Sequence, residues 1–447
     1  MSDDAPAGAP RRPSRLVARS PIYYGWWVIA AGTLGAMMTN PGQTTGVSVF
    51  LDHIIADLGL SRSGIATLYL GGTLLGSLTL PFSGRFIDRR GPRTAVIVFA
   101  SAFALACAWM GLAFEAFTLL IGFTLIRALG QGALTLVSAH VIAIWFVRKR
   151  GVAIGLLGIG TALAGAVFPI LIETLIGAFG WRTSYVLLGG LIAVTILPIG
   201  ALVFRDRPEA YGLLPDGVAP VQAPDSDEGG VDANDDSDAA AGDDDARVAE
   251  IDYTLPEARR TVTFWLFVAG LTFASALGTG LVFHHFSILG EGGVSRADAA
   301  LAFVWFGVAS ASSNLTTGAL IRRVPPRFLL SVMLLMLSAS LVLAGFVPGP
   351  EVIVFYGLLL GVRSGMFGSL DGNVFAYYFG RTHLGTVKGF ATTSLVVGSA
   401  ISLLIMAAGY DLLGSYTVTM LICAVPPFLL GVTAPFLNLV HPDGRVR

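Results

Sequence analysis

The sequence predicts an all-α integral membrane protein whose twelve transmembrane helices form two halves of six. Three observations predict this fold class. Of the 447 residues, 54% are hydrophobic and only 13% are charged, whereas ordinary soluble domains carry about 25% charged residues. The chain contains twelve runs of mainly apolar residues, each with the roughly 20 residues that cross the hydrocarbon core of a bilayer. An acidic segment separates six of these runs from the other six.

The spans before the acidic segment form the first predicted half. Hydropathy places them at 24–50, 61–82, 94–113, 116–146, 152–178 and 183–204. The second half holds the spans 263–289, 297–320, 328–347, 352–379, 385–409 and 415–440. Residues 1–20 are polar and Arg-rich and lack the short apolar core of a removable signal peptide. We therefore expect the first run to be retained in the membrane.

The distribution of Lys and Arg predicts the orientation of the spans. With the N-terminus in the cytoplasm, 23 of the 28 Lys and Arg lie in cytoplasmic segments, three on the other side and two inside spans. Cytoplasmic loops carry an excess of positive charge. We therefore predict a multi-pass protein of the plasma (inner) membrane, with both tails, 1–23 and 441–447, in the cytoplasm.

The segment 205–262 connects the halves 24–204 and 263–440. Its central part, 216–252, holds 13 acidic residues and one Arg among Ala, Gly, Pro and Ser. Such a composition cannot bury a hydrophobic core. We predict an acidic disordered cytoplasmic linker, which is either a solvated tether or a regulatory or binding tail.

The two halves share a weak internal repeat. The segment from Gly84 to Arg93 follows the second span, and the segment from Gly318 to Arg327 follows the eighth, at an offset of 234 residues. Gly155 and Gly389 have the same offset, as do Gly180 and Gly414. Many transporters are built from duplicated halves, so we interpret the halves as parallel six-helix repeats.

The residues after the second span resemble the signature of the major facilitator superfamily. The signature is matched by Gly84, Asp88, Arg89, Gly91 and Arg93, in the expected loop of a twelve-span chain. The resemblance covers the whole chain except the linker. The second copy departs from the signature by placing Arg322 where Asp88 stands.

This resemblance implies a conformational latch between the halves, formed by the five residues of the first copy. Asp88 can accept hydrogen bonds from nearby arginines and can face the positive end of a helix from the other half. In the family that partner lies near the start of the eleventh span, here around 385–388. The contact favours the state closed to the cytoplasm. The alternative is a local ion pair within the loop.

A closer resemblance is to the branch that contains monocarboxylate and oxalate/formate carriers. It is carried by Gly25-Trp26-Trp27, by the segment GVSVF at 46–50 and by the segment WFVRKRGVAIG at 145–155. The chain departs from that branch in two places. The eighth span lacks the branch's arginine, and Lys388 lies only three residues into the eleventh span. These departures argue against an oxalate-like dianion.

Two arginines lie inside predicted spans and are the candidate substrate ligands. Arg127 is about 11 residues into the fourth span and Arg363 about 12 into the tenth. A charge at mid-bilayer costs a few kcal/mol and so requires a partner or a cavity. The resemblance implies that the first, fourth, seventh and tenth spans line a central cavity. Guanidinium binds carboxylate in a fork, so both arginines fit an anionic substrate.

Polar residues at helical spacing extend this candidate site. Arg127, Gln131, Thr135 and Ser138 are separated by four, four and three residues and share one helix face. Asn40 and Thr44 are similarly spaced in the first span, where Pro41 and Gly42 are expected to break the helix and free carbonyls. We predict that Arg127, Gln131, Arg363, Asn40 and Thr44 bind substrate. The alternative for Arg127 is helix packing or proton coupling.

Asp371 is the candidate for a coupling proton, because it is the carboxylate well inside a cavity-lining span. The alternative is a structural ion pair. Arg363 is eight residues away, about 12 Å along a helix axis, which is too far for an unbridged bond. Glu173, near the outer end of the fifth span, is expected to be an interfacial or packing residue, as are His284 and His285 near the outer end of the seventh.

Other classes of protein are excluded by composition and motifs. Cys107 and Cys423 lie in apolar runs and supply neither a disulfide framework nor a thiolate metal site. A net charge of −1 gives no reason to expect nucleic acid. The sequence has no phosphate-binding loop, paired metal-binding His or nucleophile elbow in context. We therefore expect no enzyme, no cofactor and no bound metal.

The predicted function is secondary active transport of a small organic anion, such as a monocarboxylate, by alternating access. The partners would be an anionic small molecule, protons or a counter-substrate, and the bilayer around a monomer. One alternative is efflux of amphipathic drug-like compounds through a cavity rich in aromatic residues. An alternative of another class is a membrane receptor that signals through the acidic linker.

Overall fold

The computed structural model describes residues 14–146, 149–217, 253–321, 323–346, 350–380 and 383–437. Within these ranges all regular secondary structure is helical and there is no strand. Buried hydrophobic side chains from these helices pack into one cluster. The predicted all-α fold class is confirmed.

The first half consists of residues up to 217. Its helices are α1 (Arg15–Ala18), α2 (Gly25–Met37), η1 (Asn40–Gly42), α3 (Thr44–Leu58), α4 (Arg62–Ser77), α5 (Leu80–Gly111), α6 (Ala116–Ile126), η2 (Arg127–Leu134), α7 (Thr135–Trp145) and α8 (Arg150–Leu202). Two 3-10 turns follow, η3 (Pro208–Tyr211) and η4 (Pro215–Gly217).

The second half begins at residue 253. Its helices are α9 (Leu255–Ala258), α10 (Val262–Phe283), α11 (His285–Glu291), α12 (Arg296–Leu320), α13 (Pro326–Gly345), α14 (Pro350–Phe379), α15 (Leu384–Leu413), α16 (Tyr416–Thr433) and the 3-10 turn η5 (Ala434–Phe436).

These helices account for twelve membrane spans. Nine segments of the described chain are long and apolar enough to cross a bilayer. Two of them, Arg62–Gly111 and Val152–Leu202, each contain two spans. The spans of the first segment are joined at Gly91 (φ 79°) and those of the second at Gly180 (φ 76°). At both glycines the backbone leaves the helical region. The remaining span is α2 with α3, which a break divides into pieces too short to be counted.

The structure differs from the predicted boundaries at the connections. The signature segment after the second span is helical from Leu80 onward, and only Gly91 departs from helical geometry. The predicted linker 205–262 is folded at both of its ends, where η3, η4 and α9 lie. Short polar turns with proline at their first positions explain this, because proline presets the backbone angle of a turn. Residues 218–252 lie outside the described chain.

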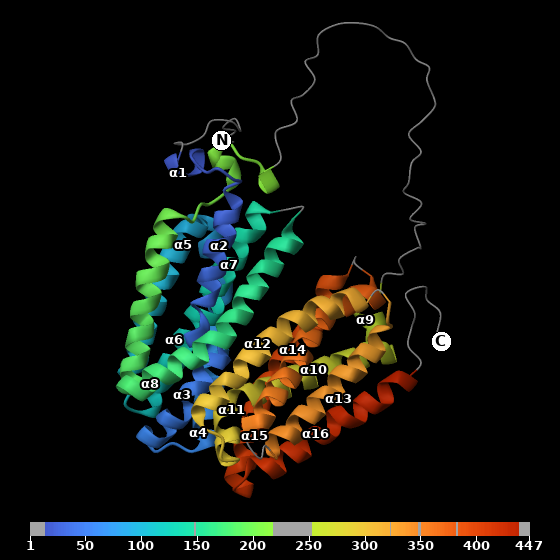
Figure 1. Cartoon of the computed structure of the whole chain (residues 1–447). Helices are drawn as coiled ribbons and strands as arrows, with labels where there is room; N and C mark the ends of the chain where they lie inside the picture. The colour runs from blue at the N-terminus through green and yellow to red at the C-terminus, as the bar shows by residue number, and fades with distance from the viewer. Residues whose placement is uncertain are drawn as a thin grey trace, which may run out of the picture.

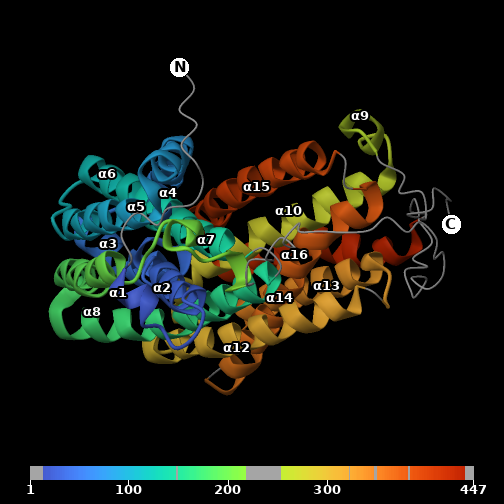
Figure 2. The ribbon, with the colours of Figure 1, turned by 90° about the horizontal axis from the view of Figure 1, so that it is seen from above.

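The two halves meet at one end of the molecule and diverge toward the other (Figures 1 and 2). We call the end that carries the signature segment and α9 the motif end, and the opposite end the far end. The halves touch where α12 packs on α8, α15 on α4, and α10 and α11 on α3. All hydrogen bonds and ion pairs that join the halves within the described chain lie at the far end. The molecule is therefore closed at the far end and open at the motif end.

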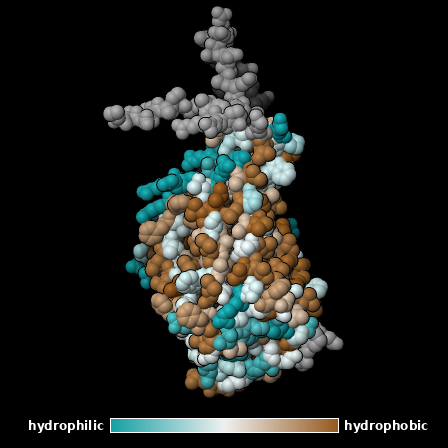
Figure 3. All heavy atoms as spheres, turned by 90° about the vertical axis from the view of Figure 1, so that its left-hand side faces the viewer, coloured by the Kyte–Doolittle hydropathy of each residue, from teal (hydrophilic) through white to brown (hydrophobic). Residues whose placement is uncertain are grey.

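The surface has the polarity of a membrane protein. Hydrophobic side chains form a broad band across the face of the first half that Figure 3 shows, with hydrophilic side chains gathered toward its two ends. Leu105, Val194 and Leu112 are more than two-thirds exposed, and apolar surface of this extent on a soluble monomer would be unusual. The band therefore fits lipid contact.

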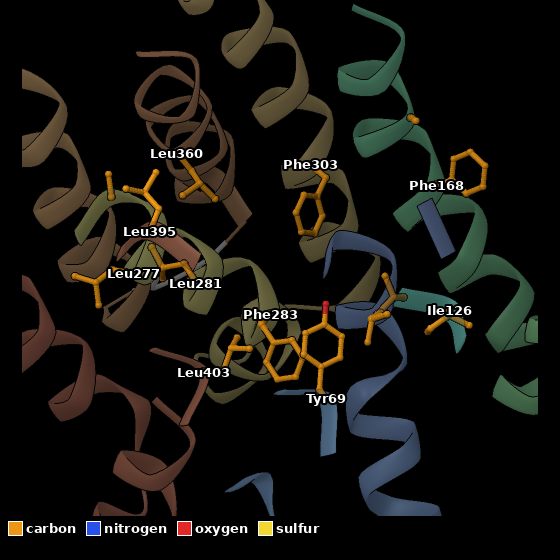
Figure 4. Close-up of a cluster of buried hydrophobic side chains, with 14 of the residues drawn as sticks. Tyr69, Ile126, Phe168, Leu277, Leu281, Phe283, Phe303, Leu360, Leu395 and Leu403 are labelled. Atoms are coloured by element: carbon orange, nitrogen blue, oxygen red, sulfur yellow. The ribbon is translucent and has the colours of Figure 1, made fainter. Parts of the chain in front are cut away.

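The two halves also share a buried apolar contact. The rings of Tyr69, from α4, and Phe283, at the end of α10, lie beside each other (Figure 4) with centroids 4.7 Å apart. Aromatic pairs at this separation stabilise packing beyond the area that they bury. This contact adds an aromatic pair to the surface on which the two halves meet.

Candidate functional site

A cavity of about 180 Å³ lies between the halves, next to this aromatic contact. Its wall comes from α10, α12 and α14 of the second half and from the first residue of α3. The lining residues are Thr44, Ala274, Ser275, Gly278, Thr279, Val282, Phe306, Arg363, Ser364 and Phe367. One cation, four hydroxyl groups and two aromatic rings therefore face one small space.

Arg363 supplies the positive charge of the cavity. Its side chain is only 4% exposed, and its Nη1 donates to the carbonyl oxygen of Ala274 at 3.0 Å. Its Nε is buried and has no hydrogen-bond partner among the described residues. A buried donor without a partner is costly, so this guanidinium is suited to an anionic ligand.

Gly278 makes room for this guanidinium. A Cβ at position 278 would lie 2.7 Å from Nη1 and Nη2 of Arg363. Even alanine at this position would therefore push the guanidinium out of its present place.

Arg127 occupies the equivalent place in the first half but is bound within the protein. It is 8% exposed, and its Nε donates to Thr73 Oγ1 at 3.0 Å and its Nη1 to the carbonyl oxygen of Gly42 at 3.3 Å. Its guanidinium also lies over the ring of Tyr69, 4.9 Å from the centroid. Arg127 is not among the residues that line the cavity.

The two arginines make the same backbone contact in the two repeats. Each reaches from the fourth helical span of its half to a backbone carbonyl of the first, Gly42 in one case and Ala274 in the other. In the first half this carbonyl is free because the helix is broken. η1 is a 3-10 turn with Pro41 inside it, and Gln43 is extended. The break predicted from Pro41 and Gly42 is therefore present, and its carbonyl accepts from Arg127 rather than lining the cavity.

The predicted polar stripe on the fourth span is divided in the structure. Residues Arg127–Leu134 form a π-helix, whose wider turn shifts the side chains from their α-helical positions. Thr135 accepts from Gln43 Nε2 at 3.4 Å, and Ser138 is buried against Gly35. Gln131 is exposed. The stripe therefore faces the first span for the most part and does not form a wall of the cavity.

The two predicted residues of the first span have different surroundings. Thr44 lines the cavity, and its hydroxyl is 3.0 Å from that of Tyr69. Asn40 is buried in the helix break, where its Oδ1 has no partner among the described residues. The structure brings Thr44 and Arg363 to one cavity and leaves Asn40 and Gln131 outside its lining.

Asp371 lies on α14, two turns beyond Arg363. One of its carboxylate oxygens is 3.7 Å from Nζ of Lys388, at the start of α15. The other oxygen, Oδ1, is buried without a partner among the described residues. The partner of Asp371 is therefore Lys388, which leaves Arg363 available to the cavity.

The signature residues lie at the motif end, where the halves are apart. Asp88 and Arg89 are exposed, and no hydrogen bond or ion pair joins Asp88 to another residue of the described chain. Gly84 has open space around it. The contact with the second half that the resemblance implies for Asp88 is therefore not made among the described residues, and the latch stays a prediction.

The last signature residue, Arg93, joins the start of the third span to the end of the sixth. The backbone N–H of Arg93 donates to Asp206 Oδ1 at 3.1 Å, and its Nη2 donates to the carbonyl oxygen of Ala201 at 2.6 Å. A Cβ on Gly91 would lie 2.3 Å from the same Asp206 oxygen. Asp206 was not predicted from the sequence, because it lies in the segment assigned to the linker.

Comparison with known proteins identifies the family. Residues 29–291, more than half of the chain, match the family model described as the Major Facilitator Superfamily. The chain belongs to this superfamily. The superfamily resemblance stated from Gly84 to Arg93 is thereby confirmed, whereas the monocarboxylate and oxalate/formate branch stays a prediction.

Individual members of the superfamily match this chain over only part of their own length. An uncharacterised MFS-type transporter, YhcA, of Bacillus subtilis (strain 168) is 32% identical over 177 residues, which are 39% of this chain and 31% of that protein. A multidrug resistance protein B homolog of Mycobacterium tuberculosis (strain H37Rv) is 34% identical over 170 residues, 38% of this chain and 31% of that protein. The chain spans about a third of the length of these two relatives.

A solved structure shares the whole fold. The crystal structure of a bacterial homolog to the human lysosomal transporter Spinster, in an inward-facing and occupied conformation, superimposes with a TM-score of 0.67. The match covers 92% of this chain and 95% of the other at 17% identity, so it shows the fold alone. This match confirms the predicted architecture of two helical halves. The prediction that the chain is not an enzyme is confirmed by its family, whose members are transporters.

The superfamily chain also holds a group of far-end residues that sequence reasoning missed. Asp52, Arg62, Glu173, Ser287 and Arg296 join the two halves by hydrogen bonds. Glu173, which we expect from the sequence to be an interfacial or packing residue, forms an ion pair with Arg296 of the other half. A signal was present, because Arg62, Arg182 and Arg296 are the only cations predicted on that side of the membrane.

Proposed function

We propose that this protein is a secondary transporter that carries a small organic anion by alternating access, with the anion held at Arg363. The observation that carries the proposal is the buried guanidinium of Arg363, which faces the cavity between the halves with Nε unpaired in the described chain. A carboxylate can take two parallel hydrogen bonds from such a group. Thr44, Ser275, Thr279 and Ser364 add hydroxyl donors around it.

Arg127 is assigned a positioning role in this proposal. Two of its nitrogens are bound to Thr73 and Gly42, and its face is covered by Tyr69. It thereby fixes the break in the first span next to Thr44. One cavity cation rather than two favours a substrate with a single negative charge, such as a monocarboxylate.

The remaining features of the proposal concern energy and orientation. Energy would come from protons or from a counter-substrate, and Asp371 beside Lys388 is the candidate proton site. The excess of Lys and Arg at the motif end supports a cytoplasmic position for that end and for both termini in the plasma membrane. The protein would act as a monomer in the bilayer. The five signature residues would act as the latch when the motif end closes.

Uptake into proteoliposomes tests the proposal. The probes are radiolabelled lactate, pyruvate, acetate, formate and oxalate, with and without an inward proton gradient. We expect saturable uptake of at least one monocarboxylate, lost in Arg363→Gln and partly kept in Arg363→Lys, since lysine retains the charge but not the fork. The control Gly372→Ala changes an open position on the same helix. No uptake of any of the five anions would overturn the proposal.

Efflux of amphipathic compounds is the second candidate, favoured by Phe306 and Phe367 in the cavity and by the name of the Mycobacterium tuberculosis relative. Export of an uncharged or cationic amphipathic dye should survive Arg363→Gln. Dye export that persists in this variant, together with an absence of anion uptake, would favour efflux. The receptor hypothesis predicts instead that deletion of residues 218–252 silences the protein, whereas a transporter should keep its flux.

A further inference from the structure

The far end of the molecule is closed by a cluster of charged side chains from both halves. Asp52 on α3, Arg62 on α4 and Glu173 on α8 belong to the first half, whereas Ser287 on α11 and Arg296 on α12 belong to the second. We call these five residues the far-end clamp. From its geometry we infer that Arg296 is the residue that holds the far end shut, and that its release is a required step of the transport cycle.

Arg296 is bound through all three of its nitrogens to the opposite half. Its Nε donates to both carboxylate oxygens of Glu173, at 3.0 and 3.1 Å. Its Nη1 donates to Asp52 Oδ2 at 3.1 Å and its Nη2 to the carbonyl oxygen of Val49 at 2.5 Å. One side chain of the second half thus satisfies two carboxylates and one carbonyl of the first.

The second oxygen of Asp52 joins the rest of the clamp. Asp52 Oδ1 accepts from Ser287 Oγ at 2.6 Å and from Arg62 Nη1 at 3.0 Å. Arg62 also donates to Ser287 Oγ at 2.6 Å, and its guanidinium lies over the ring of Tyr410, 4.6 Å from the centroid. Asp52 therefore contacts the second half through both of its oxygens.

The clamp is partly shielded from solvent, which strengthens it. The side chains of Asp52, Arg62, Glu173 and Arg296 are between 19% and 27% exposed. Exposed ion pairs contribute little to stability, but charge-assisted hydrogen bonds in a shielded site are roughly twice as strong as neutral ones. Two positive and two negative charges also balance, so the closed clamp leaves no uncompensated charge.

The clamp shares its helices with the substrate cavity. Thr44, which lines the cavity, and Asp52 lie on α3. Val282, which also lines the cavity, is near the end of α10, and Ser287 lies on α11 immediately after it. A movement of either helix around a bound substrate therefore changes the distance between Asp52 and Ser287. The requirement for release during transport rests on the proposed function, whereas the closing role of Arg296 does not.

A second ion pair at the same end provides a matched control. Arg182 binds Asp57, and both residues belong to the first half. Arg182 also donates to the carbonyl oxygen of Ala113, again within that half. Loss of this pair removes an arginine from the far end without breaking a contact between the halves.

Distance measurements by double electron–electron resonance test the inference. Spin labels are placed at Phe114→Cys in the first half and Leu412→Cys in the second, which are 68% and 84% exposed near the far end. The background carries Cys107→Ala and Cys423→Ala, because both native cysteines are unpaired. The protein with the unsubstituted clamp and the Arg182→Gln control should each give a single short distance between the two spin labels.

We expect Arg296→Gln to add a longer distance and to raise the ratio of open to closed far ends about tenfold or more, since several charge-assisted bonds are lost. Arg296→Lys, which keeps the charge without the fork, and Glu173→Gln should give smaller shifts in the same direction. A distribution in Arg296→Gln and Glu173→Gln that matches Arg182→Gln, in protein that melts normally, would overturn the inference. A clear shift without any anion uptake by the unsubstituted protein would keep the clamp and reject the proposed substrate.

Discussion

Arg363 and Arg127 show how one residue type can serve two purposes at equivalent positions. Both are buried and both bind a backbone carbonyl of the first span of their half. Arg127 has further partners in Thr73 and Tyr69, whereas the Nε of Arg363 lacks a partner within the described residues. The difference lies in how completely the hydrogen-bond donors of each guanidinium are paired, and it is why we propose ligand binding at Arg363 rather than at Arg127.

A substitution at Gly278 tests this assignment without removing the charge. In Gly278→Ala the new Cβ would meet the end of the Arg363 side chain, which can move aside because it is flexible. We expect anion affinity to fall about tenfold, the equivalent of roughly 1.4 kcal/mol, with little change in melting temperature. Equilibrium binding of a radiolabelled anion measures this, and Gly372→Ala is the control because its Cβ would meet open space. Equal affinities in the two variants would contradict the role of Gly278.

At the scale of elements, two glycines of the signature differ in whether their position accepts a side chain. Gly91 has φ 79° and ψ 156°, a region open almost exclusively to glycine, and a Cβ there would also strike Asp206. Gly84 is helical with nothing within 4 Å of its Cβ position. The turn between the second and third spans therefore depends on Gly91 and not on Gly84.

This contrast predicts different stabilities for two similar substitutions. Gly91→Ala should lower the free energy of unfolding by about 2 kcal/mol or more, from backbone strain and a weakened contact with Asp206. Gly84→Ala should leave stability unchanged or slightly raised, because alanine is a better helix former. Thermal unfolding of the purified variants in detergent decides between them. Equal melting temperatures would show that the turn tolerates a side chain at position 91.

Element-scale features also mark the limit of prediction from sequence. Hydropathy located the twelve spans, and Pro41 with Gly42 indicated the break that the structure contains. The π-helix at Arg127–Leu134 could not be predicted, because the apolar pattern that locates a membrane span does not distinguish its wider turn from that of an α-helix. Arg296 stood out in the sequence as a cation on the far side, but its binding to Asp52 and Glu173 could not be predicted, since it depends on how three helices from two halves are aligned.

At the scale of the whole molecule, the structure is open at the motif end and closed at the far end. Thr279 lines the cavity and lies between these ends. In a background without native cysteines, Thr279→Cys should react with a membrane-impermeant thiol reagent from the motif side only. With the motif end in the cytoplasm, as we propose, inside-out vesicles should label and intact cells should not.

Release of the far end should reverse this accessibility. Addition of Arg296→Gln to Thr279→Cys should allow labelling in intact cells, because the cavity would then reach the outer solution. Labelling of Thr279→Cys from outside before this change, or from neither side after it, would contradict the arrangement of gates described above.

The central claim is that Arg363 holds an anionic substrate, and equilibrium binding tests it most directly. The measurement is saturable binding of radiolabelled pyruvate, lactate or acetate to the purified protein, its Arg363→Gln variant and its Gly372→Ala variant. The account predicts binding of at least one of these anions to the unsubstituted protein and to Gly372→Ala, and none to a folded Arg363→Gln. Undiminished binding to Arg363→Gln would contradict the claim.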